Sequence, residues 1–244
     1  MNAHDIAQGM LWYLVFLFSL TCHEAAHAVS ALRGGDPTAA RGGQASLNPI
    51  PHVQRERMGT VVVPLLSYFL GGFMIGWASA PLDPRWRDRH PHRAAWVALA
   101  GPAANFLIAA VAAGAMILGL KSGAFALPDR EMLSVSHLVV TASGEPTGLT
   151  SMLSIAYVLN LLLGVFNLLP VPPLDGATAI GLALSKEQAR RTTRWLHQGT
   201  ASMFGILIAW VLIDYLFPPI LRTTLDWILA GGCRGQRPSQ APRA

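Results

Sequence analysis

The chain has 244 residues, of which 52% are hydrophobic and only 13% charged, and its mean hydropathy is +0.40. This composition excludes an ordinary soluble protein and indicates an integral membrane protein. The net charge of +5 does not indicate nucleic-acid binding, because the arginines lie in short loops between apolar segments, where topology and lipid headgroups explain them. The two cysteines, Cys22 and Cys233, match no disulfide framework or metal spacing.

Four apolar stretches are long enough to cross or nearly cross a bilayer, whose hydrocarbon core needs roughly 20 helical residues. They are residues 10–32, 59–80, 94–120 and 151–174. A fifth stretch begins at residue 200 and continues to Pro218, and a separate amphipathic segment is expected at 220–229. The first stretch is too long for a signal-peptide core, so we expect it to remain in the protein as a span.

These stretches predict an all-α, polytopic membrane bundle with about four to six membrane segments. Residues 1–230 are expected to form a single membrane-embedded domain, followed by a disordered basic tail at 231–244. A small β element is expected after the first helix, because residues 42–47 alternate small and polar side chains without charge. Such an edge strand could receive an unwound substrate by strand addition.

The distribution of basic residues predicts the topology. The loops at 33–57, 85–93 and 186–194 are rich in basic residues and should be cytoplasmic, whereas 121–151 is poor in them. This rule puts both flanks of the stretch 59–80 on one side of the membrane. A re-entrant hairpin, broken at its prolines and glycines, would explain this and would wall a polar chamber. The alternative is an ordinary span with unfavourable flanks.

The first stretch contains the motif HEAAH at residues 23–27. Residues four apart share one face of a helix, so His23 and His27 can bind one metal ion with Glu24 beside them. Ionisable side chains inside a membrane are costly unless they are paired or coordinated. The motif therefore indicates half of a zinc-hydrolase site within the membrane.

A catalytic zinc site needs a third protein ligand and an open position for water. The segment NLLPVPPLDG, residues 167–176, ends an apolar helix with three prolines and then presents Asp175. Asp175 is the strongest candidate for the third ligand. It could also cap a helix that begins near Gly176, and the two roles are compatible.

With these residues the chain resembles the intramembrane site-2 metalloproteases, whose signatures are HExxH in one span and NxxPxPxLDG at the end of a later one. Both are present without a mismatch, about 150 residues apart. Between them, GPAAN at residues 101–105 is similar to the family's GPxxN element. The resemblance covers residues 12–176 and is specific because the signatures occur together.

The resemblance implies that His23, His27 and Asp175 bind one Zn²⁺ per chain and that Glu24 is the general base. The implied activity is cleavage of transmembrane or membrane-associated protein substrates by zinc-activated water. We expect a multi-pass protein of a prokaryotic cell (inner) membrane. The loop 121–151 is too short for the PDZ domain of some relatives, and no CBS pair is expected, so a separate adaptor or regulator is a candidate partner.

Three further polar residues are candidates for support near the cleft: Asn105, Asn167 and His52. Asn105 could equally bond a neighbouring helix, with Gly101-Pro102 simply starting a span. Asn160 is expected to make a helix contact. His52 could reach the cleft mouth from its loop or could be an ordinary solvated histidine.

Two other functions compete with this interpretation. The tripeptide around Ser143 is similar to a serine-protease nucleophile turn, but it lies in a polar loop and no later span offers a histidine base. A membrane zinc transporter or metal-sensing protein could also hold histidine and aspartate in a bundle. Transport predicts further acidic or polar residues along a path, and the stretches 94–120 and 151–174 offer only asparagines and hydroxyl groups.

Overall fold

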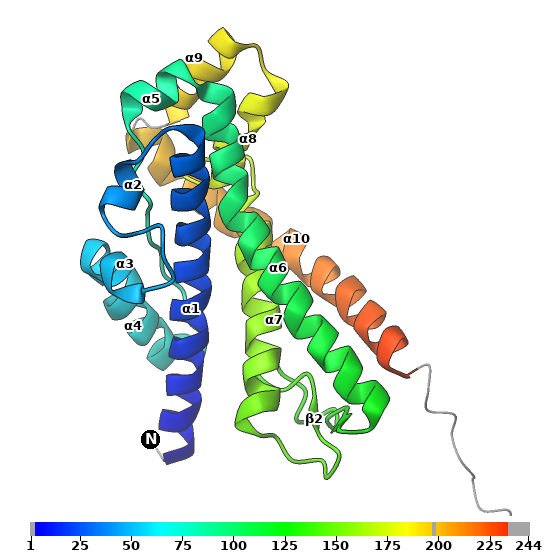
Figure 1. Ribbon diagram of the computed structural model, residues 1–244. Coiled ribbons are helices and arrows are strands. Elements are labelled where there is room, and N and C mark those ends of the chain that lie inside the picture. The colour runs from blue at the N-terminus through cyan, green and yellow to red at the C-terminus, as the bar shows by residue number, and fades with distance from the viewer. Residues whose placement is uncertain (1–2, 197–198, 234–244) are drawn as a thin grey trace, which may run out of the picture.

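A computed structural model describes residues 3–196 and 199–233, which are mostly helical (Figure 1). Four helices are long and apolar enough to cross a membrane. They are α1 (Ala3–Gly34), α6 (Pro91–Ser122), α7 (Gly148–Asn167) and α10 (Gly199–Cys233). The all-α membrane bundle predicted from the sequence is therefore confirmed.

Shorter elements connect these helices. They are α2 (Thr38–Arg41), α3 (Pro49–Arg55), a π-helical turn (Met58–Val62), α4 (Val63–Gly71), α5 (Pro84–Arg89), α8 (Asp175–Ala179), a 3-10 turn (Ile180–Ala183) and α9 (Lys186–Leu196). A two-stranded antiparallel sheet pairs β1 (Phe125–Ala126) with β2 (Val140–Thr141).

The edge strand expected at residues 42–47 does not form, and the small sheet lies instead between α6 and α7. Gly43 has a φ of 79°, which is left-handed rather than extended backbone. Ser46 Oγ also donates a hydrogen bond to the Gly43 carbonyl oxygen at 2.9 Å. Residues 42–47 therefore form turns and bends, and the prediction of an edge strand at this segment is wrong, so substrate addition there loses the observation that motivated it.

Small residues allow α1 and α6 to lie close together. Ala28 and Ala31 on α1 and Ala94 on α6 are fully buried. Lipid tails are as apolar as leucine, so helices in a membrane associate mainly through close van der Waals packing and hydrogen bonds. Between α1 and α7 larger side chains fill the interface, among them Phe16 and Ile155.

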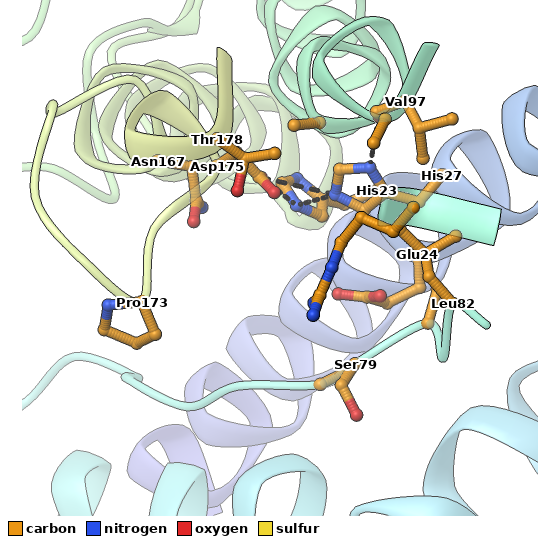
Figure 2. Close-up of a pocket in the computed structure, with 15 residues that line it drawn as sticks. His23, Glu24, His27, Ser79, Leu82, Val97, Asn167, Pro173, Asp175 and Thr178 are labelled. Atoms are coloured by element: carbon orange, nitrogen blue, oxygen red, sulfur yellow. Dashed lines mark hydrogen bonds and ion pairs between the residues drawn. The ribbon is translucent and has the colours of Figure 1, made fainter. Parts of the chain in front are cut away.

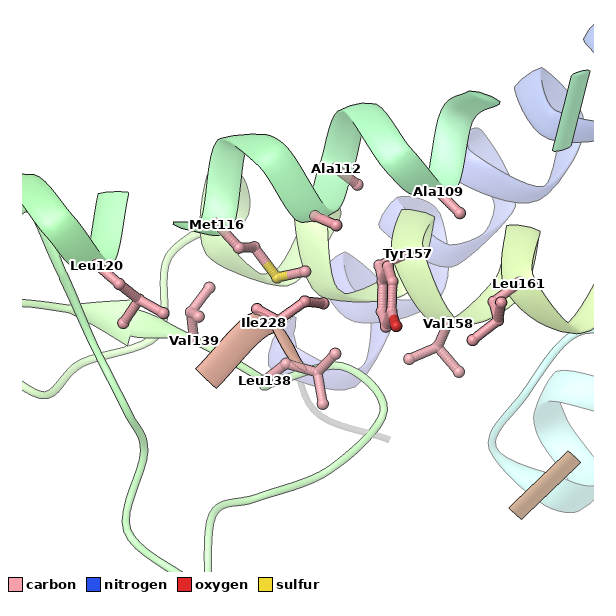
Figure 3. Close-up of a cluster of buried hydrophobic side chains, with 11 residues drawn as sticks. Ala109, Ala112, Met116, Leu120, Leu138, Val139, Tyr157, Val158, Leu161 and Ile228 are labelled. Atoms are coloured by element: carbon pink, nitrogen blue, oxygen red, sulfur yellow. The ribbon is translucent and has the colours of Figure 1, made fainter. Parts of the chain in front are cut away.

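A second apolar core lies between α6, α7 and the C-terminal part of α10 (Figure 3). We call its buried residues the distal cluster: Ala109, Ala112, Ala113, Met116, Leu120, Leu138, Val139, Tyr157, Val158, Leu161 and Ile228. Two of them, Leu138 and Val139, come from the loop between the long helices. This loop therefore closes one end of the bundle.

The apolar stretch 59–80 doubles back instead of running through the bundle. Its helical part ends at Gly71, and Gly72 takes a left-handed φ of 75°. The backbone N–H of Trp77 donates to the Gly59 carbonyl oxygen at 3.0 Å, which puts the two ends of the stretch side by side. This is the path that the re-entrant prediction requires, and an ordinary span would separate these ends.

Two boundaries differ from the sequence prediction. Helix α7 ends at Asn167, before the first proline, rather than at residue 174. Helix α10 continues through Pro218 and Pro219, so residues 220–229 are not a separate segment. Proline removes one hydrogen bond but keeps a helical φ, and an apolar environment favours preserving the remaining backbone bonds. Of the predicted tail, 231–233 belong to α10 and 234–244 lie outside the described residues.

The basic connecting helices gather at one end of the bundle. Figure 1 shows α5 and α9 together at the top, while the loop with β1 and β2 lies at the opposite end. A salt bridge of 2.7 Å between Arg194 and Asp88 joins α9 to α5. For the loops at 85–93 and 186–194, this segregation agrees with the predicted topology, in which they share one side.

Candidate metal centre

The two histidines of the HEAAH motif lie on one face of α1, as their spacing predicts. Their Nε2 atoms are 3.0 Å apart, and both side chains are buried. The rings are nearly perpendicular, with an interplanar angle of 80°. His23 and His27 therefore converge on one point inside the bundle (Figure 2).

Partners on α6 fix the orientation of both imidazoles. His27 Nδ1 donates to the Val97 carbonyl oxygen at 2.7 Å, and His23 Nδ1 donates to Asn105 Oδ1 at 2.5 Å. Because both of these oxygens can only accept, the ring proton of each histidine lies on Nδ1. Each Nε2 consequently presents a lone pair to the shared point, an arrangement typical of metal-binding histidines.

Asn105 is held in turn by a chain of hydrogen bonds across the bundle. Its Nδ2 donates to Asn160 Oδ1 at 2.8 Å, and Asn160 Nδ2 donates to Ser19 Oγ at 2.8 Å. Ser19 Oγ donates to the Val15 carbonyl oxygen at 2.7 Å. The three polar side chains are fully buried. This network defines which way the Asn105 amide points and therefore the tautomer of His23.

Gly101 makes room for the imidazoles against α6. A Cβ at this position would overlap the rings of both His23 and His27. The sequence interpretation allowed Gly101-Pro102 to start a span, but both residues lie inside α6. The glycine is required because the histidines lie directly against the α6 backbone.

Asp175 approaches the histidines from the other side, after the proline-rich turn that follows α7 (Figure 2). Its Oδ2 lies 3.2 Å from Nε2 of His23 and 3.2 Å from Nε2 of His27. The N-cap of α8 is Leu174, so Asp175 is not the cap residue that the alternative interpretation required. A Cβ at Gly176 would overlap the backbone at the end of α7, which explains why glycine follows the aspartate.

The three groups fit a zinc ion. Each offers one ligand atom, and these atoms all lie within 4.8 Å of one another. Zinc–nitrogen bonds of about 2.0–2.1 Å at tetrahedral angles separate ligand atoms by about 3.3 Å, close to the 3.0 and 3.2 Å found here. Two nitrogen lone pairs and a carboxylate oxygen repel one another unless a cation lies among them. Two histidines and one carboxylate are also a ligand set of catalytic zinc sites.

A cavity of about 270 Å³ opens beside this centre. Glu24 contributes to its lining, and this residue is only 4% exposed. Residues 78–80, on the returning arm of the hairpin, form part of its wall. Ser79 ties this arm down, because its Oγ donates to Glu56 Oε1 at 2.6 Å and its carbonyl oxygen accepts from Gln44 Nε2 at 2.8 Å. The hairpin therefore walls a polar chamber, as predicted.

The candidate support residues take different places. Asn105 lies behind His23 rather than in the cavity, and Asn160 makes the expected helix contact. Asn167 lines the cavity, with Nδ2 donating to the Leu163 carbonyl oxygen at 3.0 Å. His52 does not line it: the residue is 1% exposed, and its ring Nε2 donates to the Ser46 carbonyl oxygen at 3.3 Å.

Several residues of the site were not found from the sequence. The Val97 carbonyl belongs to the backbone and leaves no signal in the sequence, and Ser19 lies within the apolar stretch 10–32, where a single hydroxyl group does not stand out. Arg87 also lines the cavity, although its loop appeared to contain only arginines that set the topology. A polar residue one turn from a histidine was the one usable signal, since Ser19 precedes His23 by four residues on α1.

Comparison with known proteins places these features in a family. Residues 11–212 match the family described as Peptidase family M50. The chain is 33% identical over 224 residues to "Putative zinc metalloprotease YwhC" of Bacillus subtilis (strain 168), covering 91% of each chain. It is 29% identical over 198 residues to "Putative zinc metalloprotease Rip2" of Mycolicibacterium smegmatis (strain ATCC 700084 / mc(2)155), covering 81% of this chain and 64% of that one. No solved structure matches the chain.

Proposed function

The chain belongs to peptidase family M50, the site-2 protease family, and from this premise we propose that it is an intramembrane zinc metalloendopeptidase that cleaves transmembrane protein substrates. Membership supports the coarser class, a membrane-integral zinc metalloprotease. The observation that carries the finer proposal is the convergence of two imidazoles and a carboxylate beside a second, buried carboxylate in one cavity.

We assign His23, His27 and Asp175 as the protein ligands of one zinc ion per chain. The histidine Nε2 atoms and Asp175 Oδ2 supply the ligand atoms, and the bonds from Nδ1 to α6 hold both rings in place. Zinc bound there would supply Lewis acidity, which makes water nucleophilic near neutral pH. An open fourth position toward the cavity is what distinguishes a catalytic from a structural zinc site.

Glu24 is assigned as the general base. It follows His23 directly and lines the same cavity, so its carboxylate can reach a water that lies beside the ligands. One Glu24 oxygen takes the proton of the attacking water as the water oxygen bonds to the peptide carbonyl carbon. The same carboxyl group then gives the proton to the amide nitrogen, so that the carbon–nitrogen bond breaks and an amine leaves.

The location of the site supports an intramembrane substrate. The ligands of α1 lie within a helix that is long enough to span a bilayer, and large apolar side chains elsewhere on it, Leu14 and Phe18, are exposed toward the surroundings. A substrate segment would therefore reach the cavity from the lipid bilayer or from its surface. We place the protein in a prokaryotic cell (inner) membrane, acting through a single domain at 1–230, with a separate adaptor or regulator as a candidate partner.

The test compares wild type with Glu24→Gln in proteoliposomes that contain a tagged transmembrane test substrate. We expect Glu24→Gln to retain one zinc per chain and to lose cleavage by about 10⁴-fold, since it loses the base while keeping the ligands. Glu145→Gln, an exposed acid in the loop before α7, is the matched control and should cleave as wild type does. Equal cleavage by Glu24→Gln would remove the base assignment.

Zinc flux separates the alternative function from the proposed one. A transporter or metal sensor would retain zinc without cleaving any substrate, and a transporter would also move zinc across the vesicle membrane. Wild type that cleaves the substrate while zinc stays outside the vesicles supports the protease. Wild type that moves zinc and cleaves nothing supports the transporter.

A further inference from the structure

One arginine, Arg87, is found among the described residues that line the cavity beside the metal centre. The side chain is half-buried, and its Nε–H has no hydrogen-bond partner within the described part of the chain. A buried donor without a partner is unfavourable. An arginine placed in this way differs from the exposed Arg85 and Arg89 of the same helix and requires an explanation.

Helix α5 holds Arg87 at a fixed position. Trp86, which is 5% exposed, packs against Ala31 of α1 and Ala94 of α6. On the other side Asp88 pairs with Arg194 of α9 at 2.7 Å. The residues before and after Arg87 are therefore both anchored, and the arginine is attached to a rigid part of the wall, as pre-organised binding groups require.

The charges in the cavity favour a negative charge on a substrate oxygen. The described lining has two carboxylates, Glu24 and Asp175, and one guanidinium, so their formal charge is one negative. A zinc ion changes this to one positive. Burial lowers the pKa of Arg87 and the neighbouring Asp88 opposes this shift, but a guanidinium remains protonated in proteins. When Glu24 takes the proton of the attacking water, its negative charge passes to the substrate oxygen, so the total charge of the cavity stays one positive and a cationic donor beside that oxygen is favourable.

We propose that Arg87 binds the carbonyl oxygen of the scissile peptide bond and stabilises the negative charge that develops on it. The inference rests on the proposed protease function. When the water oxygen bonds to the carbonyl carbon, the electron pair of the C=O double bond moves to the oxygen. The Arg87 N–H groups donate to this oxyanion, and the pair returns when the carbon–nitrogen bond breaks. Donors that are already in place stabilise such charge without reorganisation.

The experiment measures cleavage and, independently, binding of a phosphinic peptide whose anionic tetrahedral centre mimics the oxyanion. We expect Arg87→Ala to lower kcat by about 10²–10³-fold with little change in KM, as loss of one oxyanion donor does elsewhere. The phosphinic peptide should bind more weakly by a similar factor. Affinity for the uncleaved substrate in a Glu24→Gln background, and zinc content, should stay within twofold of the values without the Arg87 change.

The matched control is Arg85→Ala, which removes the same charge from an exposed position of α5 and should behave as wild type. Arg87→Lys should recover part of kcat, because it restores the charge but not the planar fork. If Arg87→Ala does not fold, Arg87→Lys and Arg87→Gln with full zinc content take its place in the binding assay.

Three results would overturn the assignment. One is unchanged cleavage and unchanged phosphinic-peptide affinity in the Arg87 variants. Another is a shift of the acidic limb of the pH–rate profile while the affinity for the phosphinic peptide is unchanged. Because this limb reports protonation of the general base, the result would mean that Arg87 acts on Glu24 and not on the substrate. The third is an equal loss of affinity for the phosphinic peptide and the uncleaved substrate. Failure of the proposed function itself would be recognised differently: the wild-type protein would cleave no peptide. Failure of the Arg87 assignment would show only when the variants are compared with an active wild type.

Discussion

The two halves of α6 are held to their neighbours in different ways. Near Gly101 the helix contacts α1 through directional hydrogen bonds and through an approach so close that no Cβ fits. Beyond Ala109 it contacts α7 and α10 through the apolar side chains of the distal cluster. Hydrogen bonds and close backbone contacts place atoms accurately, whereas apolar packing can adjust to changes in shape. We therefore expect metal binding to depend on the first half and stability on the second.

The largest effect within this comparison is expected for Gly101→Ala. The new Cβ would overlap both imidazoles, so His23 and His27 could not keep their positions against α6. We expect zinc affinity to fall by about 100-fold or more, beyond the usual cost of losing an outer partner of one ligand. Competition with a chelator, followed by zinc analysis, measures the change.

Gly114→Ala is the control for this substitution, because a Cβ at Gly114 meets no atom within 4 Å and the residue lies in the same helix. Zinc affinity should be unchanged there, with stability raised by up to about 1 kcal/mol through helix propensity. Full zinc affinity in Gly101→Ala would show that the histidines can shift without cost, and it would contradict the claim that metal binding depends on the close contact near Gly101.

Asn105→Ala should have the next largest effect. It removes the acceptor of the His23 Nδ1–H bond and the donor to Asn160, so the imidazole loses its fixed orientation. Removing such an outer partner typically lowers metal affinity by about 10–100-fold. Asn105→Asp keeps an acceptor for His23 and should retain more affinity than Asn105→Ala. Identical zinc affinity in both variants and wild type contradicts the role assigned to the network.

Met116→Ala should affect stability alone. Met116 is fully buried in the distal cluster, and truncation of such a side chain costs about 2–5 kcal/mol when the cavity does not collapse (Figure 3). We expect a lower Tm in detergent with unchanged zinc affinity and unchanged cleavage per folded molecule. A drop in zinc affinity similar to that of Asn105→Ala would mean that the two halves of α6 are coupled.

The helices and the principal site residues could be predicted because their signals are local. The apolar stretches at α1, α6 and α7 are long, and the HEAAH spacing places two histidines on one helical face whatever surrounds them. The prolines after Asn167 end α7 and leave Asp175 next to the turn. Each of these inferences needed only a few neighbouring residues.

The errors came from segments whose local pattern was weak. Residues 42–47 alternate in the way of a strand, but no strand in the described part of the chain pairs with them and the left-handed Gly43 turns the chain. His52 is separated from the cavity because α3 packs its ring inward, a result that depends on where α3 lies. The proline pair in α10 signals a break, yet the helix continues because a membrane helix keeps every backbone bond it can.

Periodicity and motif spacing act over short distances along the chain, so they were enough to predict the membrane class and the long helices and, with the family resemblance, to propose the four residues of the catalytic site. The partners that orient the histidines are visible only in the folded protein: the Val97 carbonyl, the Asn105–Asn160–Ser19 network and the space at Gly101. The position of Arg87 beside the cavity is also visible only there. Such partners come from helices far apart in sequence. Their roles depend on distances of a few ångströms between backbones, which helix packing sets and no local pattern records.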